Sequence, residues 1–484
     1  MQNVIYNALV TKSSRFFIKG GIDMSAIEMS NYTKKNSLVP SVKECEIPIK
    51  GYCVAHKMRN TLVAMALADK LHANQQRDGG APYIIHPLMT TKYLIDLEIR
   101  EQLENWPAYN KDDINSLFDA ICAACMLHDV IEDCFGDDFR DAKKKAKEFF
   151  DQYHLDTRVY DWVLKLSKDK NAFKDNENRK EAEVAYYNGL QEEAVTMLLK
   201  IVDRTNNCST MDVFTKERMI KYVYEVKEFY YPMCAYLRKY YPEFSNAVTI
   251  MKYLLESICE TVASMLELHD VINREPERYK KTFDFIRYYA KGSMRNTLVA
   301  LALSSKYYSG YFRQSQDPFI VHPLRVCSYL INLKVTDDEI CAAALLHEVP
   351  KKWQSKEESW ETLFRDTYKI SQRTIDLVNK VSNSKNLSKE EYYKELAKDP
   401  DAFIIKLSNR AHTCTYLSGL TYEQIDEFVM ECIDYIYPLC DELSMLYPEY
   451  TDAIILAKYH IQAVNNITIR LQEIKKEEEN QQAQ

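Results

Sequence analysis

The chain has 484 residues, of which 46% are hydrophobic and only 24 are glycine or proline (10 Gly, 14 Pro). This composition is typical of a globular, mainly helical protein with two to four domains. The formal net charge of −8 argues against an extended basic surface for nucleic acid or an acidic membrane. The 13 cysteines are scattered through helix-like segments, which favours reduced thiols and a cytoplasmic location. No apolar run approaches the roughly 18–20 residues of a membrane helix, so no membrane span is expected.

Residues 1–45 have no signal-peptide pattern and are expected to form a loosely structured extension, in which Met24 is as good a start site as Met1. Beyond it, apolar residues recur with the helical period of 3.6. This period predicts helices over residues 53–74, 86–98, 117–133, 139–153, 157–167, 180–187, 190–206 and 213–259. No convincing run alternates with a period of two, so the predicted fold class is all-α.

The chain contains an internal repeat. MRNTLVAMAL at 58–67 returns as MRNTLVALAL at 294–303, identical in nine of ten positions. Further pairs follow in the same order, among them YIIHP with FIVHP, MLHDVIED with LLHEVPKK and KIVDRTNN with KLSNRAHT. Matched segments that keep their order along a chain indicate two copies of one unit. We therefore expect two tandem helical bundles.

The repeat divides the chain into five predicted parts. They are an N-terminal extension (1–45), a first domain (46–262), a linker (263–287), a second domain (288–466) and a charged tail (467–484). The first copy is longer in Arg100–Asn115 and in Lys168–Arg179, which are charged and turn-rich and are predicted to be surface loops. The tail is rich in Glu, Lys and Gln, so we expect a frayed helix or disorder there.

The stretch Met126–Asp133, MLHDVIED, has the most unusual chemistry. His128 and Asp129 follow small apolar residues, and Glu132 and Asp133 come one helical turn later. On a continuous helix, residues four apart share a face. A histidine and three acids are costly to bury unless a metal ion or polar partners balance them. We therefore interpret this stretch as functional.

Four residues of the first copy are candidate ligands of one metal ion: His86, His128, Asp129 and Asp203. Two imidazoles and two carboxylates give a neutral N/O shell around a divalent cation, which suits Mn, Fe, Co or Zn. Such a metal lowers the pKa of a bound water and polarises a phosphorus centre. Glu132 and Asp133 could then orient or deprotonate that water.

Three segments of the first copy resemble the HD-domain hydrolases of the RelA/SpoT type, which remove the 3′-pyrophosphate of ppGpp and pppGpp. The segments are HANQQRDGGAPYIIHP at 72–87, MLHDVIED at 126–133 and KIVDRTNNCSTM at 200–211. The resemblance covers about residues 53–215, and the second copy in degraded form. It implies a bundle of HD-domain type, Mn²⁺ as the usual metal, and an intact first domain.

The resemblance also implies residue roles. It assigns the metal to His86, His128, Asp129 and Asp203, water activation to Glu132 and Asp133, guanine stacking to Arg77, and nucleotide contacts to Tyr83, Asn207 and Thr210. Lys165 is a further candidate for substrate phosphate, with a solvated helix end as the alternative. Two positions depart from the pattern. Asp78 could weaken binding of an anionic substrate. Asn206 replaces a histidine that is not a ligand, so we expect retained chemistry with a changed substrate contact.

The second copy keeps two histidines and one of the four acids. His322 and His347 remain, while Glu348, Asn409, Lys351 and Lys352 stand where the first copy has Asp129, Asp203, Glu132 and Asp133. The charge at the last two positions changes from −2 to +2, which disfavours a divalent cation. We expect a catalytically inactive copy. It is either a structural partner in an intramolecular pseudo-dimer or a metal-free anion or nucleotide sensor that uses Lys351, Lys352 and Arg313.

Three functions therefore stay open. The first is a metal-dependent pyrophosphohydrolase of (p)ppGpp in the cytoplasm, with a small nucleotide as substrate. The second is an HD phosphohydrolase of another nucleotide or phosphoester. The third is a non-catalytic nucleotide sensor, since a fold alone does not fix a function.

Overall fold

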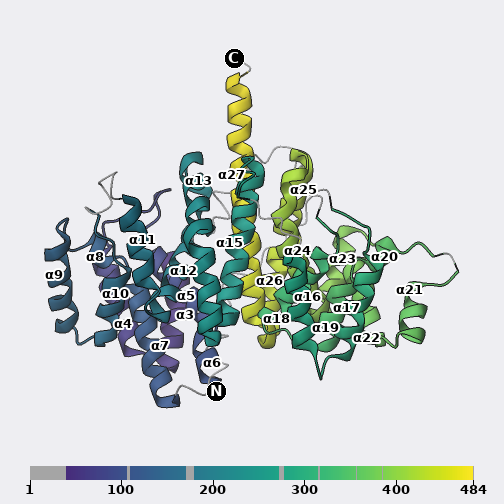
Figure 1. Cartoon of the computed structure of the whole chain (residues 1–484), viewed down its shortest axis with the longest axis horizontal. Helices are drawn as coiled ribbons and strands as arrows, with labels where there is room; N and C mark the ends of the chain where they lie inside the picture. The colour runs from purple at the N-terminus through teal and green to yellow at the C-terminus, as the bar shows by residue number, and fades with distance from the viewer. Residues whose placement is uncertain are drawn as a thin grey trace, which may run out of the picture. The chain divides into compact units, whose positions relative to one another are not determined.

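The structure is a computed structural model that describes residues 40–105, 110–170, 179–271, 277–313, 317–355, 357–383 and 385–482 (Figure 1). Within these ranges there is no strand, and the extended pairings are two isolated bridges, Gln76 with Pro82 and Phe312 with Pro318. The predicted all-α class is confirmed. The first 39 residues of the predicted extension lie outside the described ranges.

The first half of the chain forms helices up to Met265. They are α3 (Val42–Ala55), α4 (Arg59–Leu71), α5 (Ile85–Asp96), α6 (Ile99–Glu104), α7 (Lys111–Met126), α8 (Val130–Asp133), α9 (Phe139–Gln152), α10 (Thr157–Leu166), α11 (Arg179–Leu190), α12 (Ala194–Ser209), η2 (Met211–Val213), α13 (Lys216–Glu225), the π-turn η3 (Val226–Tyr230), α14 (Tyr231–Tyr240), η4 (Pro242–Phe244) and α15 (Ser245–Met265).

The second half has a similar order of helices, without a counterpart of α6 among its described residues. It contains α16 (Glu277–Ala290), α17 (Arg295–Tyr307), α18 (Val321–Asn332), α19 (Asp338–Leu346), α20 (Val349–Lys352), α21 (Trp360–Thr362), the π-turn η5 (Leu363–Thr367), α22 (Gln372–Ser382), α23 (Lys389–Leu396), α24 (Pro400–Thr413), η6 (Cys414–Gly419), α25 (Tyr422–Glu431), the π-turn η7 (Cys432–Ile436), α26 (Tyr437–Leu446), η8 (Pro448–Tyr450) and α27 (Thr451–Gln482). The isolated bridge and the π-turn before α14 and α26 recur at matching places.

Several predicted helices are confirmed, and others are interrupted. Residues 139–153 and 157–167 form α9 and α10 as predicted. The predicted helix 53–74 is wrong as one piece, because Lys57 adopts a positive φ of 57° and separates α3 from α4. The predicted loop Arg100–Asn115 is partly wrong, since α6 and the start of α7 occupy most of its described residues.

The predicted helix 117–133 also breaks, between α7 and α8. Leu127 has φ −112° and ψ 10°, which ends α7. The last carbonyls of a helix lack main-chain partners. Here the His128 ring supplies one, since its Nδ1 lies 2.7 Å from the carbonyl oxygen of Cys125. The MLHDVIED stretch therefore spans the turn between α7 and α8. The prediction of one continuous helix was wrong.

One apolar stretch reaches the length of a membrane helix, although none was expected from the sequence. Asp113–Asp133 is long and apolar enough to cross a membrane by length and composition, but 78% of its apolar window is buried inside the protein. A core helix of a globular protein has the same composition. We interpret this stretch as the core of the first half, where Phe118, Ile121 and Leu127 are fully buried.

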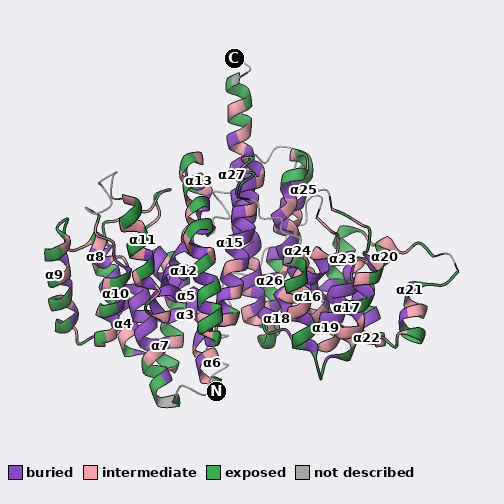
Figure 2. Ribbon diagram, in the orientation of Figure 1, coloured by how far each residue is buried: buried purple, intermediate pink, exposed green. Residues whose placement is uncertain are grey.

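The long helices α15 and α27 connect the two halves. They pack on each other, α15 also contacts α18 and η6 of the second half, and α27 contacts α5, α12 and η2 of the first half. Each half therefore receives a helix from the other half. Figure 2 shows that buried residues continue along most of α27.

The predicted charged tail is part of α27. Ile467, Leu471 and Ile474 recur at helical spacing and are buried, which explains why the helix continues. Farther on, Glu478 forms an ion pair with Lys216 at 2.7 Å. A frayed helix or disorder was expected from Arg470, and the structure shows a helix there, because its apolar face packs against the first half.

Candidate metal centre

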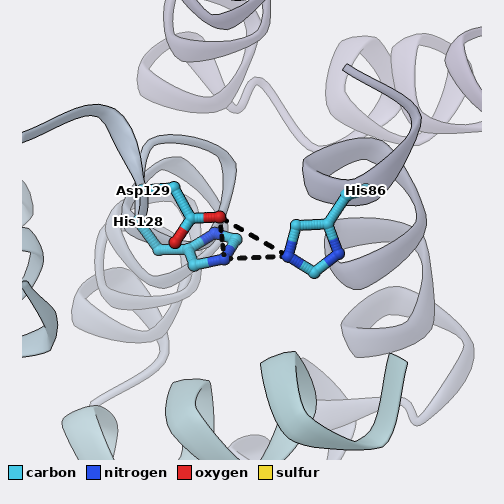
Figure 3. Close-up of side chains that lie close together, drawn as sticks. All are labelled: His86, His128 and Asp129. Carbon is cyan, nitrogen blue, oxygen red and sulfur yellow. Dashed lines mark hydrogen bonds and ion pairs between the residues drawn. The ribbon is translucent and has the colours of Figure 1, made fainter. Parts of the chain in front are cut away.

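Two helices and one turn bring the four predicted ligands together. His86 lies in the first turn of α5, His128 and Asp129 lie between α7 and α8, and Asp203 lies on α12. Pro87 also lies in the first turn of α5. Proline is tolerated there because the main-chain N–H groups of a helix's first turn have no hydrogen-bond partner within the helix. Figure 3 shows His86, His128 and Asp129 facing one another.

The ligand atoms are closely spaced. The two Nε2 atoms of His86 and His128 lie 3.1 Å apart. Asp129 Oδ2 lies 3.0 Å from His128 Nε2 and 3.6 Å from His86 Nε2. Asp203 Oδ1 lies 3.3 Å and 3.7 Å from the same two nitrogens. One imidazole nitrogen from each ring and one oxygen from each carboxylate therefore converge on one point.

Hydrogen bonds on the far side of each ring fix which nitrogen is free. The carbonyl oxygen of Cys125 can only accept, so His128 Nδ1 is the donor in that 2.7 Å bond. His86 Nδ1 lies 2.7 Å from Asn206 Oδ1, an amide oxygen that also only accepts. In the neutral rings both Nε2 atoms therefore carry a lone pair. Two lone pairs and two carboxylates that face one another fit a divalent cation.

The charges agree with this reading. The pKa of His128 lies well above its ordinary value. Burial alone would lower it, but the carboxylates of Asp129 and Asp203 raise it. Burial would raise the pKa of both carboxyl groups, yet His128 beside Asp129, and Lys200 beside Asp203, hold both below the usual range. A positive charge, either a proton or a metal ion, is thus favoured at this point.

The acidic pair lies beside these ligands. Glu132 Oε1 accepts a hydrogen bond of 2.6 Å from the main-chain N–H of Lys168. Burial raises the pKa of Glu132 to about 7, with Lys200 opposing and Asp129 adding to the shift. Asp133 accepts from Lys170 Nζ at 2.8 Å. Glu132 is therefore a carboxyl group able to take up or release a proton near neutral pH.

The predicted nucleotide-binding residues form two groups. Arg77 donates to Asn206 Oδ1 at 3.3 Å, to Asn207 Oδ1 at 2.8 Å and to Thr210 Oγ1 at 3.5 Å. Tyr83 donates its hydroxyl to Asp129 Oδ2 at 2.6 Å. Arg77, Asn207 and Thr210 thus lie together. Both Tyr83 and Asn207 contact the metal-ligand cluster directly, since Asn207 Nδ2 donates to Asp203 Oδ1 at 2.6 Å.

Two other predicted positions behave differently. Lys165 pairs with Glu193 at 2.9 Å, about three turns before Asp203 on α12, and this contact gives no support to a phosphate-binding role. Asp78 pairs with Arg218 at 2.5 Å, so its charge is balanced and its expected repulsion of an anionic substrate is reduced.

Sequence reasoning missed several supporting residues. Lys200 pairs with Asp203 Oδ2 at 2.8 Å, and the i, i+3 spacing could have revealed it. Asn206, expected to alter a substrate contact, instead fixes the tautomer of His86. The hydroxyl of Tyr459 on α27 accepts from Asn206 Nδ2 at 3.2 Å and bonds to Ser209 Oγ. No local pattern could predict Tyr459, which lies 253 positions away from Asn206.

The chain is similar in sequence to several known proteins. A family model described as HD domain matches residues 300–443, in the second half. The chain is 28% identical over 178 residues to a GTP pyrophosphokinase of Myxococcus xanthus, covering 35% of this chain and 23% of the relative. It is 29% identical over 172 residues to a guanosine-3′,5′-bis(diphosphate) 3′-pyrophosphohydrolase of Vibrio cholerae, covering 34% and 20%.

A third relative covers more of the chain. The guanosine-3′,5′-bis(diphosphate) 3′-pyrophosphohydrolase of Aquifex aeolicus is 25% identical to this chain over 251 residues. The match covers 51% of this chain and 31% of the relative. The chain spans between a fifth and a third of the length of these three relatives. These matches support the predicted resemblance at the level of an HD domain and of relatives named GTP pyrophosphokinase or guanosine-3′,5′-bis(diphosphate) 3′-pyrophosphohydrolase.

Proposed function

We propose that the first half is a metal-dependent phosphohydrolase that removes the 3′-pyrophosphate of (p)ppGpp. The facing lone pairs of His86 and His128, flanked by Asp129 and Asp203, carry this proposal. The fixed tautomers mean that this pocket suits a cation without rearrangement. The names of the pyrophosphohydrolases among the relatives support the choice of substrate.

Mn²⁺ is the metal we propose, with Fe, Co or Zn as alternatives, since two imidazoles and two carboxylates are a mixed N/O donor set. When bound, such a metal polarises a phosphoryl oxygen and makes a water more acidic. The protein's own contribution is positioning. His128 is held by Cys125, His86 by Asn206, and Asp203 by Lys200.

The neighbouring groups have matching roles. Glu132, whose pKa is raised to about 7 by burial, is the proposed acceptor of the proton from the attacking water. Asp133 orients it, and Lys170 balances the charge of Asp133. Arg77 stacks on the guanine base, and Tyr83, Asn207 and Thr210 contact the nucleotide.

We infer that the second half serves the first as a structural partner in an intramolecular pseudo-dimer. The mutual packing of α15 and α27 supports this, because each half contributes a helix to the other. The proposed setting is the cytoplasm, with no membrane and no extended nucleic-acid surface involved.

A second candidate is hydrolysis of a different nucleotide or phosphoester. The observation that favours it is the bonding of Arg77 to three acceptors of its own half, Asn206, Asn207 and Thr210, which would have to be rearranged for base stacking. This candidate keeps the metal centre and changes only the substrate.

A substrate panel tests both candidates. The full chain is loaded with Mn²⁺ and offered ppGpp, GTP, NADPH, dNTPs and cyclic nucleotides side by side, with Asp129→Ala as the control. The proposal predicts pyrophosphate release from ppGpp that is lost in the variant. Turnover of another compound alone would select the second candidate. Metal binding without any turnover would refute both and favour a nucleotide sensor.

A further inference from the structure

The second half contains a histidine pair with altered surroundings. His322 Nε2 and His347 Nε2 lie 3.1 Å apart, the same spacing as in the first half. Behind His322, however, stands His412 in place of Asn206, with the two Nδ1 atoms 2.8 Å apart. An amide oxygen only accepts a hydrogen bond, whereas an imidazole nitrogen can also donate one. The exchange of Asn206 for His412 therefore changes how the histidine pair can satisfy its hydrogen bonds without a cation.

The three rings form a complete chain of hydrogen bonds. His347 Nδ1 must donate to the carbonyl oxygen of Ala344 at 2.8 Å, which leaves its Nε2 as an acceptor. His322 Nε2–H can donate to that atom, and His412 Nδ1–H can donate to His322 Nδ1. Burial, and then the neighbouring His412 and His347, lower the pKa of His322 well below its ordinary value. The cluster is therefore satisfied with all three rings neutral and requires no metal ion.

Cations surround this neutral cluster. Arg313 stands at the position of Arg77, but its guanidinium lies over the ring of Tyr416 at 4.6 Å, because the hydrogen-bond acceptors of Arg77 are replaced. Lys406 stands at the position of Lys200 and lies over Tyr392 at 5.0 Å, because Asn409 replaces its carboxylate partner.

Two more lysines contact neighbours of this cluster. These neighbours are Phe319, whose ring centroid lies 6.4 Å from that of His322, and Glu348, whose Oε1 lies 3.6 Å from His347 Nε2. Lys352 lies over Phe319 at 4.7 Å, and Lys351 pairs with Glu348 at 3.0 Å. Among the described residues, Glu348 is the one carboxylate that forms an ion pair with any of these four cations. Burial, and then Arg410, lower the pKa of Lys406 to about 7, so Lys406 is partly charged near neutral pH and a nearby anion would favour its ammonium form. A bound anion would balance the excess positive charge.

We propose that the second half binds an oligophosphate anion directly, without a metal ion, through Arg313, Lys351, Lys352 and Lys406 around the His322–His347 pair. Guanidinium and ammonium groups are the usual donors to phosphate oxygens, and several cations spread around one cluster suit two linked phosphates better than one. The ligand class is thus inorganic pyrophosphate or the oligophosphate of a nucleotide. The inference does not depend on hydrolysis in the first half.

The test uses the full chain in EDTA and titrates inorganic pyrophosphate by calorimetry. One pyrophosphate should bind per chain, because the metal-free first site carries Asp129, Glu132, Asp133 and Asp203 and disfavours an anion. The double substitution Lys351→Glu, Lys352→Asp should weaken binding by about tenfold or more, since each lost charge-assisted hydrogen bond costs at least that factor.

A charge-matched control separates a built site from general attraction. Lys144→Glu, Lys145→Asp changes the net charge equally on the exposed face of α9 and should leave the affinity unchanged. Circular dichroism of each variant verifies the fold. Absence of binding in EDTA, or an equal loss in both double variants, would overturn the proposal. Binding that needs Mn²⁺ and disappears in Glu348→Gln would overturn it in favour of a second metal site.

Discussion

Replacing Tyr459 by phenylalanine should weaken a metal site that the residue does not touch. Its hydroxyl holds Asn206, which accepts from His86 Nδ1 and so keeps the Nε2 lone pair of His86 aimed at the ligand cluster. Loss of an outer hydrogen-bond partner of a metal ligand typically costs about 10–100-fold in metal affinity. That range equals about 1.4–2.8 kcal/mol. The global stability should fall by about 1 kcal/mol, the net value of one neutral hydrogen bond.

The repeat supplies a matched control. Tyr253 on α15 occupies the equivalent position of Tyr459, but its buried hydroxyl has no hydrogen-bond partner within the described part of the chain. Tyr253→Phe should therefore leave metal affinity unchanged. The assay is Mn²⁺ binding followed by electron paramagnetic resonance, with thermal unfolding as the measure of stability. Equal affinity in Tyr459→Phe and wild type, or an equal loss in both variants, would refute the reasoning.

Three further predictions concern stability. Burial lowers the pKa of His460 to about 3, so the unfolded state binds more protons between about pH 3 and 6.5 and stability falls as pH falls through this window. Urea unfolding should show a loss between pH 8 and pH 5 that is about 2 kcal/mol larger in the wild type than in His460→Leu, the residue type of the equivalent Leu254. Asp119→Ala should cost about 3 kcal/mol in urea unfolding, because the carboxylate accepts from the main-chain N–H groups of Asn60 and Thr61, each at 2.8 Å, and is buried. Leu471→Ala should cost about 2–5 kcal/mol by thermal unfolding, since the side chain is fully buried; a change below 0.5 kcal/mol would show that the end of α27 does not pack as described.

Local patterns predicted much of the fold. The amphipathic period of residues 139–153 and 157–167 gave α9 and α10 almost to the residue, because packing of one apolar face decides such helices. The break after Met126 was not predictable from that period. It depends on a side chain, His128, that bonds to the main chain of Cys125, and apolar spacing carries no information on such a bond. The sequence left the end of α27 open between a frayed helix and disorder, because its composition is charged while its buried face has few residues.

The candidate site shows the same division. Order and residue type sufficed to select His86, His128, Asp129 and Asp203, which the structure brings together. Their orientation depends on contacts distant in sequence, above all the bond between Asn206 and Tyr459. Lys165 was selected as a phosphate-binding candidate from its position in the chain alone. Its pairing with Glu193 shows that sequence position does not identify the partner of a basic side chain.

The number of Mn²⁺ ions bound per chain tests the central claim most directly. Metal-free protein is titrated with Mn²⁺, and the free ion is quantified by electron paramagnetic resonance. The account predicts one bound ion, lost in Asp203→Asn, which copies the Asn409 of the second half, and retained in Glu348→Gln. A bound ion that persists in Asp203→Asn, or that is lost in Glu348→Gln, would contradict the assignment of the metal centre to the first half.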